Sequence, residues 1–189
     1  MWKSVIKALT AVLAFVALLP AFVLYFARIV SYVSIAQMLS FAPGFLGIML
    51  RRVWYKCTLA SCGTDLTVDF LAWIRTPKTR VGSHVYVGVQ SLVGWADIGD
   101  DVMISGQVVV LSGNKQHGYA RLDVPMRLQE GMQEKLTIGN DVWVGVGAIL
   151  ASSVADHSVI ASGAIVTKQF AEYDILGGVP AKVIKSRKD

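Results

Sequence analysis

The sequence has few cysteines, few charges and few histidines. Cys57 and Cys62 are the only cysteines, and no further cysteine or histidine cluster lies beside them. They therefore do not form a zinc site, and we expect reduced, structural thiols in a cytoplasmic compartment. Charged residues make up 16% of the chain, the formal net charge is +5, and the basic residues do not interleave with aromatics. This pattern argues against nucleic-acid binding.

Charge is missing above all near the N-terminus. No charged residue lies from Ala8 to Ala27, and a second uncharged run extends from Ile29 to Leu50. A helix of about 20 residues is about 30 Å long and matches the hydrocarbon core of a bilayer, so the first run predicts a membrane-embedded helix. Pro43 and Gly44 break the second run, which we expect to be a second span, a re-entrant segment or an interfacial helix.

Basic residues flank these runs. Lys3 and Lys7 precede the first, and Arg51, Arg52 and Lys56 follow the second. Because basic clusters favour the cytoplasmic side, both ends are expected there, as in a hairpin or a non-spanning anchor of the inner membrane. A cleaved signal peptide is the alternative, but the apolar stretch is too long and no small-residue cleavage site closes it. We therefore expect residues 1–56 to be the membrane anchor and residues 57–189 to be a separate domain facing the cytoplasm.

Beyond Gly63, aliphatic residues recur mostly every six positions. The repeated positions are Val68, Ile74, Val81, Val87, Val93, Ile98, Ile104 and Val110, then Ile138, Val144, Leu150, Val154, Ile160 and Val166. A period of six fits neither an amphipathic helix nor a long alternating strand. It predicts an all-β solenoid of about four to five coils with three flat faces, each aliphatic pointing inward on a short parallel strand.

The repeat stops between Leu111 and Leu136, and this interruption contains His117. A loop longer than about 12–15 residues inside a compact domain is usually functional or disordered. An imidazole titrates near neutral pH and suits a general base, although a surface histidine without a role is the simpler alternative. His84 and His157 fall at turn positions within the repeat, where we expect solvated corners.

Three motifs connect the repeat to a known family: IGNDVWVG from Ile138, IVTK from Ile165 and GGVPAKVIK from Gly177. They resemble the hexapeptide-repeat acyltransferases, which fold as left-handed parallel β-helices. The resemblance covers about residues 64–185. It implies transfer of an acetyl group from acetyl-CoA, and a homotrimer whose long loop reaches across the groove between neighbouring prisms. The front segment PGFLGIMLRRVWY is similar to the membrane-anchored subgroup associated with polysaccharide assembly.

The resemblance also implies roles for individual residues. His117 corresponds to the catalytic base, Asn114 and Asp123 are candidates to orient it or the acceptor, and Glu130 lies on the same loop. The residues implied for the oxyanion, the CoA chain and its anionic end are Trp143, Gly145, Val146, Ser162, Gly163, Thr167, Lys168, Lys182 and Lys185. For Lys182 and Lys185, a solvated basic tail stays the alternative. Acetyl-CoA would be a co-substrate, with no resident cofactor and no metal.

The expected activity is O-acetylation of a saccharide, lipid-linked or nascent, at the cytoplasmic membrane face. Two alternatives stay open: N-acetylation of an amino sugar, and a non-catalytic membrane-bound platform. Two other readings are disfavoured. The stretch GVGAIL at Gly145 lacks the third glycine of a dinucleotide fingerprint. A zinc carbonic anhydrase on this scaffold needs three histidines, and the loop offers His117 with Leu122 at the second position.

Overall fold

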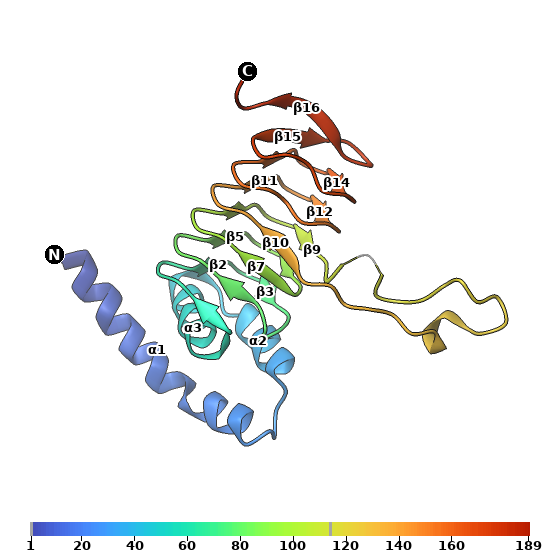
Figure 1. Cartoon of the computed structure of the whole chain (residues 1–189). Helices are drawn as coiled ribbons and strands as arrows, with labels where there is room; N and C mark the ends of the chain where they lie inside the picture. Colours follow the sequence, from blue (N-terminus) through green and yellow to red (C-terminus); the bar gives the residue numbers. More distant parts are fainter. Residues whose placement is uncertain (1, 114) are drawn as a thin grey trace.

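The computed structural model describes residues 2–113 and 115–189, and it shows three helices followed by a parallel β-helix (Figure 1). Helix α1 spans Trp2–Phe26, α2 spans Tyr32–Ser40 and α3 spans Gly44–Thr58. Within the described residues, α1 is the one helix long and apolar enough to cross a bilayer. Only 17% of its apolar stretch Ala8–Phe26 is buried. The second apolar run instead forms two short helices of 9 and 15 residues. A second full span is therefore not formed.

Short strands stack into three sheets, one for each face of the prism. Sheet A has the order β1-β4-β7-β10, sheet B the order β16-β15-β13-β11-β8-β5-β2, and sheet C the order β14-β12-β9-β6-β3. The strands are β1 (Ser61–Cys62), β2 (Thr67–Val68), β3 (Trp73–Ile74), β4 (Arg80–Val81), β5 (Tyr86–Val87), β6 (Leu92–Val93), β7 (Ala96–Ile98), β8 (Met103–Ile104), β9 (Val109–Val110), β10 (Leu136–Ile138), β11 (Trp143–Val144), β12 (Ile149–Leu150), β13 (Val159–Ile160), β14 (Ile165–Val166), β15 (Asp174–Gly177) and β16 (Lys182–Ser186). All pairings are parallel except that of β15 with β16.

The core confirms the solenoid predicted from the hexapeptide rhythm. Every aliphatic residue of the repeat is at most 5% exposed, as Ile98 is, and most are fully buried. The small or β-branched residue four positions later, such as Val85 or Ala148, is also buried. Equivalent residues stack from coil to coil, as Val87 pairs in register with Ile104. Each inward side chain therefore packs on its counterpart in the next coil, and this repetition fixes the register.

Corners of the coil carry the left-handed backbone that a tight turn requires. At the corner between sheets A and B, this conformation occurs at His84, Asp101, Asp141 and His157, with φ between 50° and 61°. At the corner between sheets B and C it occurs at Leu71, Gln90, Gln107, Gly147 and Gly163. We call these the A–B corner and the B–C corner, and the third the C–A corner.

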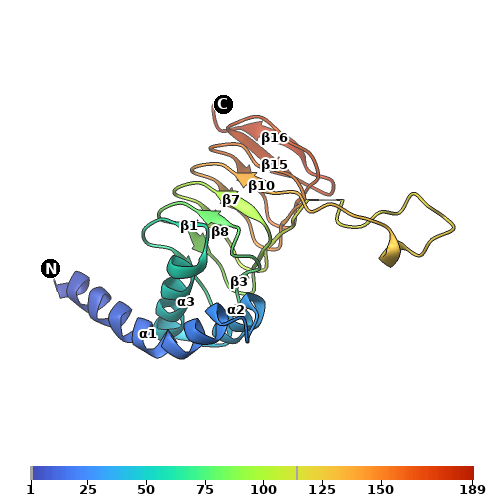
Figure 2. The same ribbon diagram turned by 60° about the horizontal axis from the view of Figure 1, so that its bottom comes forward.

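Helix α3 covers the open end of the first coil (Figure 2). Arg51 is fully buried, and its Nε donates to the Val68 carbonyl at 2.8 Å. Arg52 Nε donates to the Leu66 carbonyl at 2.6 Å, and Lys56 Nζ bonds the carbonyls of Cys62 and Gly63. These three cations cap backbone oxygens that have no further coil to pair with. Arg51, Arg52 and Lys56, expected to flank the membrane segment, are therefore part of the β-helix cap, and the cytoplasmic location of this end stays a prediction.

The segment between β9 and β10 leaves the C–A corner as an extended arm that points away from the prism in both views (Figures 1 and 2). Its two sides are joined by backbone bonds from Met132 N to Lys115 O at 2.8 Å and from Glu134 N to Ser112 O at 2.9 Å. A short 3₁₀ turn, η1 (Met126–Leu128), lies on the outer part. Within the described residues, the arm beyond its base therefore extends away from its own prism.

The C-terminal residues form a hairpin and not a loose tail. Strand β16 pairs antiparallel with β15, with Gly177 opposite Lys182 and Ile175 opposite Lys185. The turn between them carries a cis Val179–Pro180 peptide bond. Both lysines are thus displayed on an edge strand at the far end of the prism from α1 (Figure 1).

Candidate active site

His117 lies on the arm, exposed to solvent. With Lys115, Glu130 and Met132 it lines a hollow of about 490 Å³. The two sides of the arm meet closely here, because a Cβ on Gly131 would lie 2.0 Å from the Gln116 carbonyl oxygen. The glycine therefore holds the opposite side of the arm against the His117 backbone.

The residues expected to orient His117 differ in their contacts. Asp123 forms a bidentate pair with Arg121, with Nε–Oδ1 and Nη2–Oδ2 distances of 3.2 and 2.5 Å. This guanidinium lowers the pKa of Asp123. Asp123 is thus engaged by Arg121, and its part as an orienting or acceptor residue stays a prediction, whereas Glu130 shares the hollow with His117. Asn114 lies outside the described residues.

A strip of small residues runs along the B–C corner in the last two full coils. A Cβ on Gly147 or on Gly163 would meet no atom within 4 Å, so both positions face open space. Val146 is 50% exposed, and Ser162 beside Gly163 is also exposed. In the earlier coils, Gln90 and Gln107 occupy the same corner. The strip therefore offers bare backbone along which an extended ligand can lie.

Gly145 does not have a free N–H for the expected oxyanion. Its N–H already donates to the Ile160 carbonyl at 2.8 Å, and a Cβ there would lie 2.6 Å from Ser162 N. Gly145 is thus a packing residue and not the oxyanion donor. Within the part of the chain that the structure describes, the amides of Val146 and Ser162 have no backbone acceptor. Trp143 is 51% exposed beside this strip, with Nε1 3.4 Å from Ser105 Oγ.

The basic candidates separate into two groups. Thr167 and Lys168 follow β14 at the C–A corner, where Lys168 Nζ lies 5.4 Å from the centre of the Phe170 ring. Lys182 instead begins β16 beside the B–C corner, because Ala181 N donates to the Ile165 carbonyl at 2.8 Å. Sheet C separates the two groups. One protomer therefore does not bring Lys168 and His117 together with Gly163.

The other histidines are paired, and not simply solvated corners. His84 Nδ1 lies 3.2 Å from Asp101, and His157 Nδ1 lies 3.1 Å from Asp141. Arg187 Nη1 also reaches Asp141 at 3.0 Å. Hydrogen bonds from His157 and then Arg187 lower the pKa of Asp141. Both contacts join neighbouring coils, so these residues serve the stability of the A–B corner.

Cys57 and Cys62 are free thiols. Burial raises the pKa of each thiol. Both sulfurs are therefore protonated near neutral pH and are poor nucleophiles.

The chain superposes on a maltose O-acetyltransferase from Clostridium difficile 630 with a TM-score of 0.70 and 22% identity, covering 82% of this chain and 84% of that one. A hexapeptide-repeat-containing acetyltransferase from Vibrio cholerae O1 biovar eltor, complexed with acetyl coenzyme A, gives a TM-score of 0.67 and 20% identity over 83% and 87% of the two chains. The chain has the fold of the hexapeptide-repeat acetyltransferases.

Sequence similarity also relates the chain to acetyltransferases. Galactoside O-acetyltransferase of Escherichia coli (strain K12) is 29% identical over 136 residues, which is 65% of this chain and 64% of that protein. The chain thus spans just under two thirds of the length of this relative. No family model matches the sequence.

Two features were not expected from the sequence, one in the candidate site and one at the A–B corner. Gly147 was missed in the site, although it stands 16 positions before the expected Gly163 and has the same positive φ, so its place in the repeat was a usable signal. The Asp141–His157–Arg187 cluster had no such signal, because Arg187 comes from the C-terminal strand region 46 residues after Asp141. In the described residues no group of three His, Cys, Asp or Glu side chains is placed to hold a metal ion.

Proposed function

We propose that this protein is an acetyl-CoA-dependent O-acetyltransferase that acts on a saccharide hydroxyl. The observation that carries the proposal is the presence, in one chain, of an arm that contains His117 and points away from the prism, and of an open glycine strip at Gly147 and Gly163. Because the arm extends from the prism, it can bring His117 against a surface other than its own coil. The similarity to a galactoside O-acetyltransferase supports the acceptor class.

The chemistry assigned to these residues is acyl transfer. The His117 imidazole takes the proton of the acceptor hydroxyl as its oxygen attacks the thioester carbonyl. The Val146 or Ser162 amide stabilises the tetrahedral oxyanion. The carbon–sulfur bond then breaks, CoA leaves as the thiolate, and the proton returns from the imidazolium to its sulfur. Lys182 faces the anionic end of CoA as a point charge.

A homotrimer completes the proposed site. The outward residues of sheet C are all apolar and half-buried: Trp73, Leu92, Val109, Ile149 and Ile165. If left-handed prisms pack around a threefold axis with sheet C facing inward, the C–A corner of one protomer lies beside the B–C corner of the next. The arm and Lys168 of one chain would then meet the glycine strip of its neighbour.

We further propose that α1 attaches the enzyme to the cytoplasmic face of the inner membrane. Its residues Val12, Leu13 and Val16 are 62%, 68% and 56% exposed, an apolar surface that a bilayer would cover. A lipid-linked or nascent polysaccharide acceptor is confined to the same surface, which raises its effective concentration.

The test uses the full chain in detergent. Calorimetry measures acetyl-CoA binding for wild type, His117→Ala and Lys182→Ala, and release of the CoA thiol is followed with neutral and amino sugars as acceptors. We expect Lys182→Ala to weaken binding, and His117→Ala to bind normally but turn over about 10²–10⁴ times more slowly. Absence of acetyl-CoA binding to wild type would reject the enzyme in favour of a non-catalytic platform. Turnover with amino sugars alone would indicate an N-acetyltransferase.

A further inference from the structure

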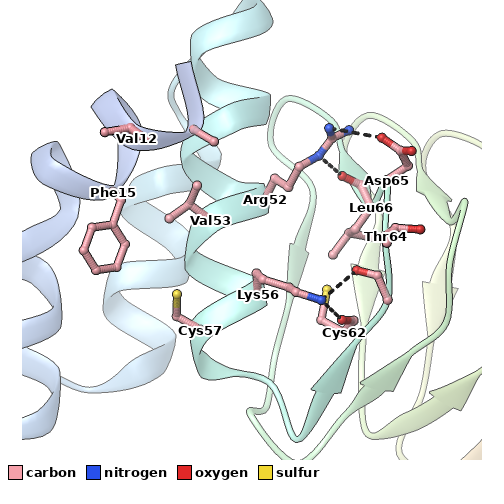
Figure 3. Close-up of a pocket in the computed structure, with 12 residues that line it drawn as sticks. Val12, Phe15, Arg52, Val53, Lys56, Cys57, Cys62, Thr64, Asp65 and Leu66 are labelled. Carbon is pink, nitrogen blue, oxygen red and sulfur yellow. Dashed lines mark hydrogen bonds and ion pairs between the residues drawn. The ribbon is translucent and has the colours of Figure 1, made fainter. Parts of the chain in front are cut away.

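A groove of about 490 Å³ lies between α1, α3 and the first coil of the β-helix (Figure 3). This volume falls within the range of small-ligand sites in proteins. Its walls are mostly apolar, with Val12 and Phe15 from α1, Val53 and Cys57 from α3, and Leu66 from the coil. The groove lies far along the prism from the proposed acyl-transfer site.

The groove exists because α1 and α3 pack closely along only part of their length. Ala14, Leu18 and Phe22 are at most 7% exposed, and Phe22 stacks on Trp54 with ring centroids 5.3 Å apart. The N-terminal end of α1 then stands away from the prism in both views (Figures 1 and 2). Phe15 is accordingly left 45% exposed at the wall. Such a surface needs an apolar occupant.

Two cations stand at the rim, one helical turn apart on α3. Arg52 lies 3.5 Å from the Asp65 carboxylate, which balances its charge. Lys56 bonds only neutral carbonyls, those of Cys62 and Gly63, among the contacts of the described residues (Figure 3). An ammonium group has three N–H donors, so Lys56 keeps one donor and its full charge for an anion. The rim is therefore net positive above an apolar groove.

We propose that this groove binds one anionic phospholipid. An acyl chain lies between Val12, Phe15 and Val53, and the phosphate rests against Lys56 with Arg52 beside it. This inference rests on the membrane attachment proposed above. The groove is at the first coil, whereas Gly147 and Gly163 are in the fourth and fifth, about 14 Å or more away at about 4.8 Å per coil. The lipid is thus a structural one that fixes the height and tilt of the prism over the membrane, and not the acceptor.

The test is native mass spectrometry of the full chain released from detergent, with phosphatidylglycerol and phosphatidylcholine of identical acyl chains. Wild type is expected to retain phosphatidylglycerol severalfold better than phosphatidylcholine. Lys56→Gln is expected to lower phosphatidylglycerol retention about fivefold, the effect of one cation near an anionic lipid surface. Val53→Trp fills the groove and is expected to reduce retention of both lipids. Lys188→Gln, exposed at the opposite end of the prism, is the matched control.

Acetyl-CoA binding by each variant verifies that it is folded. Equal retention of the two lipids by wild type, or an equal loss in Lys56→Gln and Lys188→Gln, would overturn the proposal. A dimer that Val53→Trp abolishes would overturn it too, by identifying a second copy as the occupant. Flotation with phosphatidylglycerol vesicles separates this inference from the membrane attachment itself. If wild type floats but its lipid retention does not depend on the groove, only the proposed membrane attachment is supported. If wild type retains lipid but does not float, only the proposed lipid site is supported.

Discussion

The buried guanidinium of Arg51 donates from Nε to the carbonyl oxygen of Val68 at 2.8 Å and so joins helix α3 to the first strand of sheet B. Its Nη1 donates to the carbonyls of Leu39 and Ala42 at 2.8 and 2.7 Å. One side chain thus holds the loop between α2 and α3, the helix α3 and the first coil together. The expected boundary at residue 56 falls inside α3, which ends at Thr58. Helix α3 therefore packs against the first coil and forms one unit with it.

Replacing this guanidinium should uncouple that unit. Arg51→Leu leaves several buried carbonyls without a donor, and hydrogen bonds to charged groups contribute about 1.5–3 kcal/mol each. We expect the free energy of unfolding to fall by about 3 kcal/mol or more, measured by thermal unfolding in detergent. Arg75→Leu, at an exposed corner, is the matched control. Equal stability of the two variants would show that the cap carries little of the fold.

Asp123 and Glu130 should differ in their effect on turnover. Asp123 is held by Arg121, so Asp123→Asn is expected to leave kcat within about threefold of wild type. Glu130 shares the hollow with His117, so Glu130→Gln is expected to lower kcat about tenfold if it orients the imidazole. Steady-state kinetics with a saturating sugar acceptor measures both. A larger loss in Asp123→Asn than in Glu130→Gln would reverse the assignment.

The open B–C corner predicts where acetyl-CoA lies. Ser162→Tyr places a ring over the strip beside Gly163 and should raise the Kd for acetyl-CoA at least tenfold, about 1.4 kcal/mol. Gln90→Tyr adds the same ring at the same corner in the second coil and should leave the Kd unchanged. Calorimetry distinguishes the two. Tight binding by Ser162→Tyr would place the donor on another face.

The proposed trimer predicts complementation between inactive chains. If His117 of one protomer serves the glycine strip of the next, a reassembled mixture of His117→Ala and Ser162→Tyr chains regains activity. At equal mixing, about a quarter of the sites would join an intact arm to an intact strip. The readout is turnover after detergent-mediated exchange, compared with each variant alone. A mixture as inactive as its components would mean that each site is built within one chain.

The A–B corner predicts a pH dependence of stability. Hydrogen bonds from His157 and Arg187 lower the pKa of Asp141 below its ordinary value of 3.8. A carboxyl group whose pKa is depressed in the folded state stabilises that state above its unfolded pKa, and this contribution is lost as pH falls through the folded pKa. The Tm of wild type should thus fall as the pH is lowered below about 4, and the Tm of Asp141→Asn should fall less between pH 4 and pH 3. Scanning calorimetry from pH 7 to pH 3 measures this, with Asp101→Asn as a comparison at the same corner.

Much of the fold was readable in the sequence because its cause is local. An aliphatic residue every six positions, as at Val81, Val87 and Val93, predicts where each strand and corner lies and which side chains face the core. The break in that rhythm at residues 111–136 marked the arm, and the apolar run from Ala8 marked α1, in both cases without any knowledge of neighbouring coils.

The tertiary structure decided what most of these polar groups do, since their partners lie in another coil or in another element of the fold. Arg51 looked like a flanking charge until the carbonyl of Val68, 17 residues away, was placed against it. Gly145 looked like an oxyanion donor until stacking gave its N–H to Ile160. Asp123 was a candidate partner of His117, and in the folded arm its carboxylate pairs with Arg121, two residues before it. The sequence determined the six-residue repeat of the coil because each strand and corner is specified by residues that are neighbours in the chain. Stacking decided the partners, because a hydrogen bond is a property of two groups that only the folded chain brings within 3 Å.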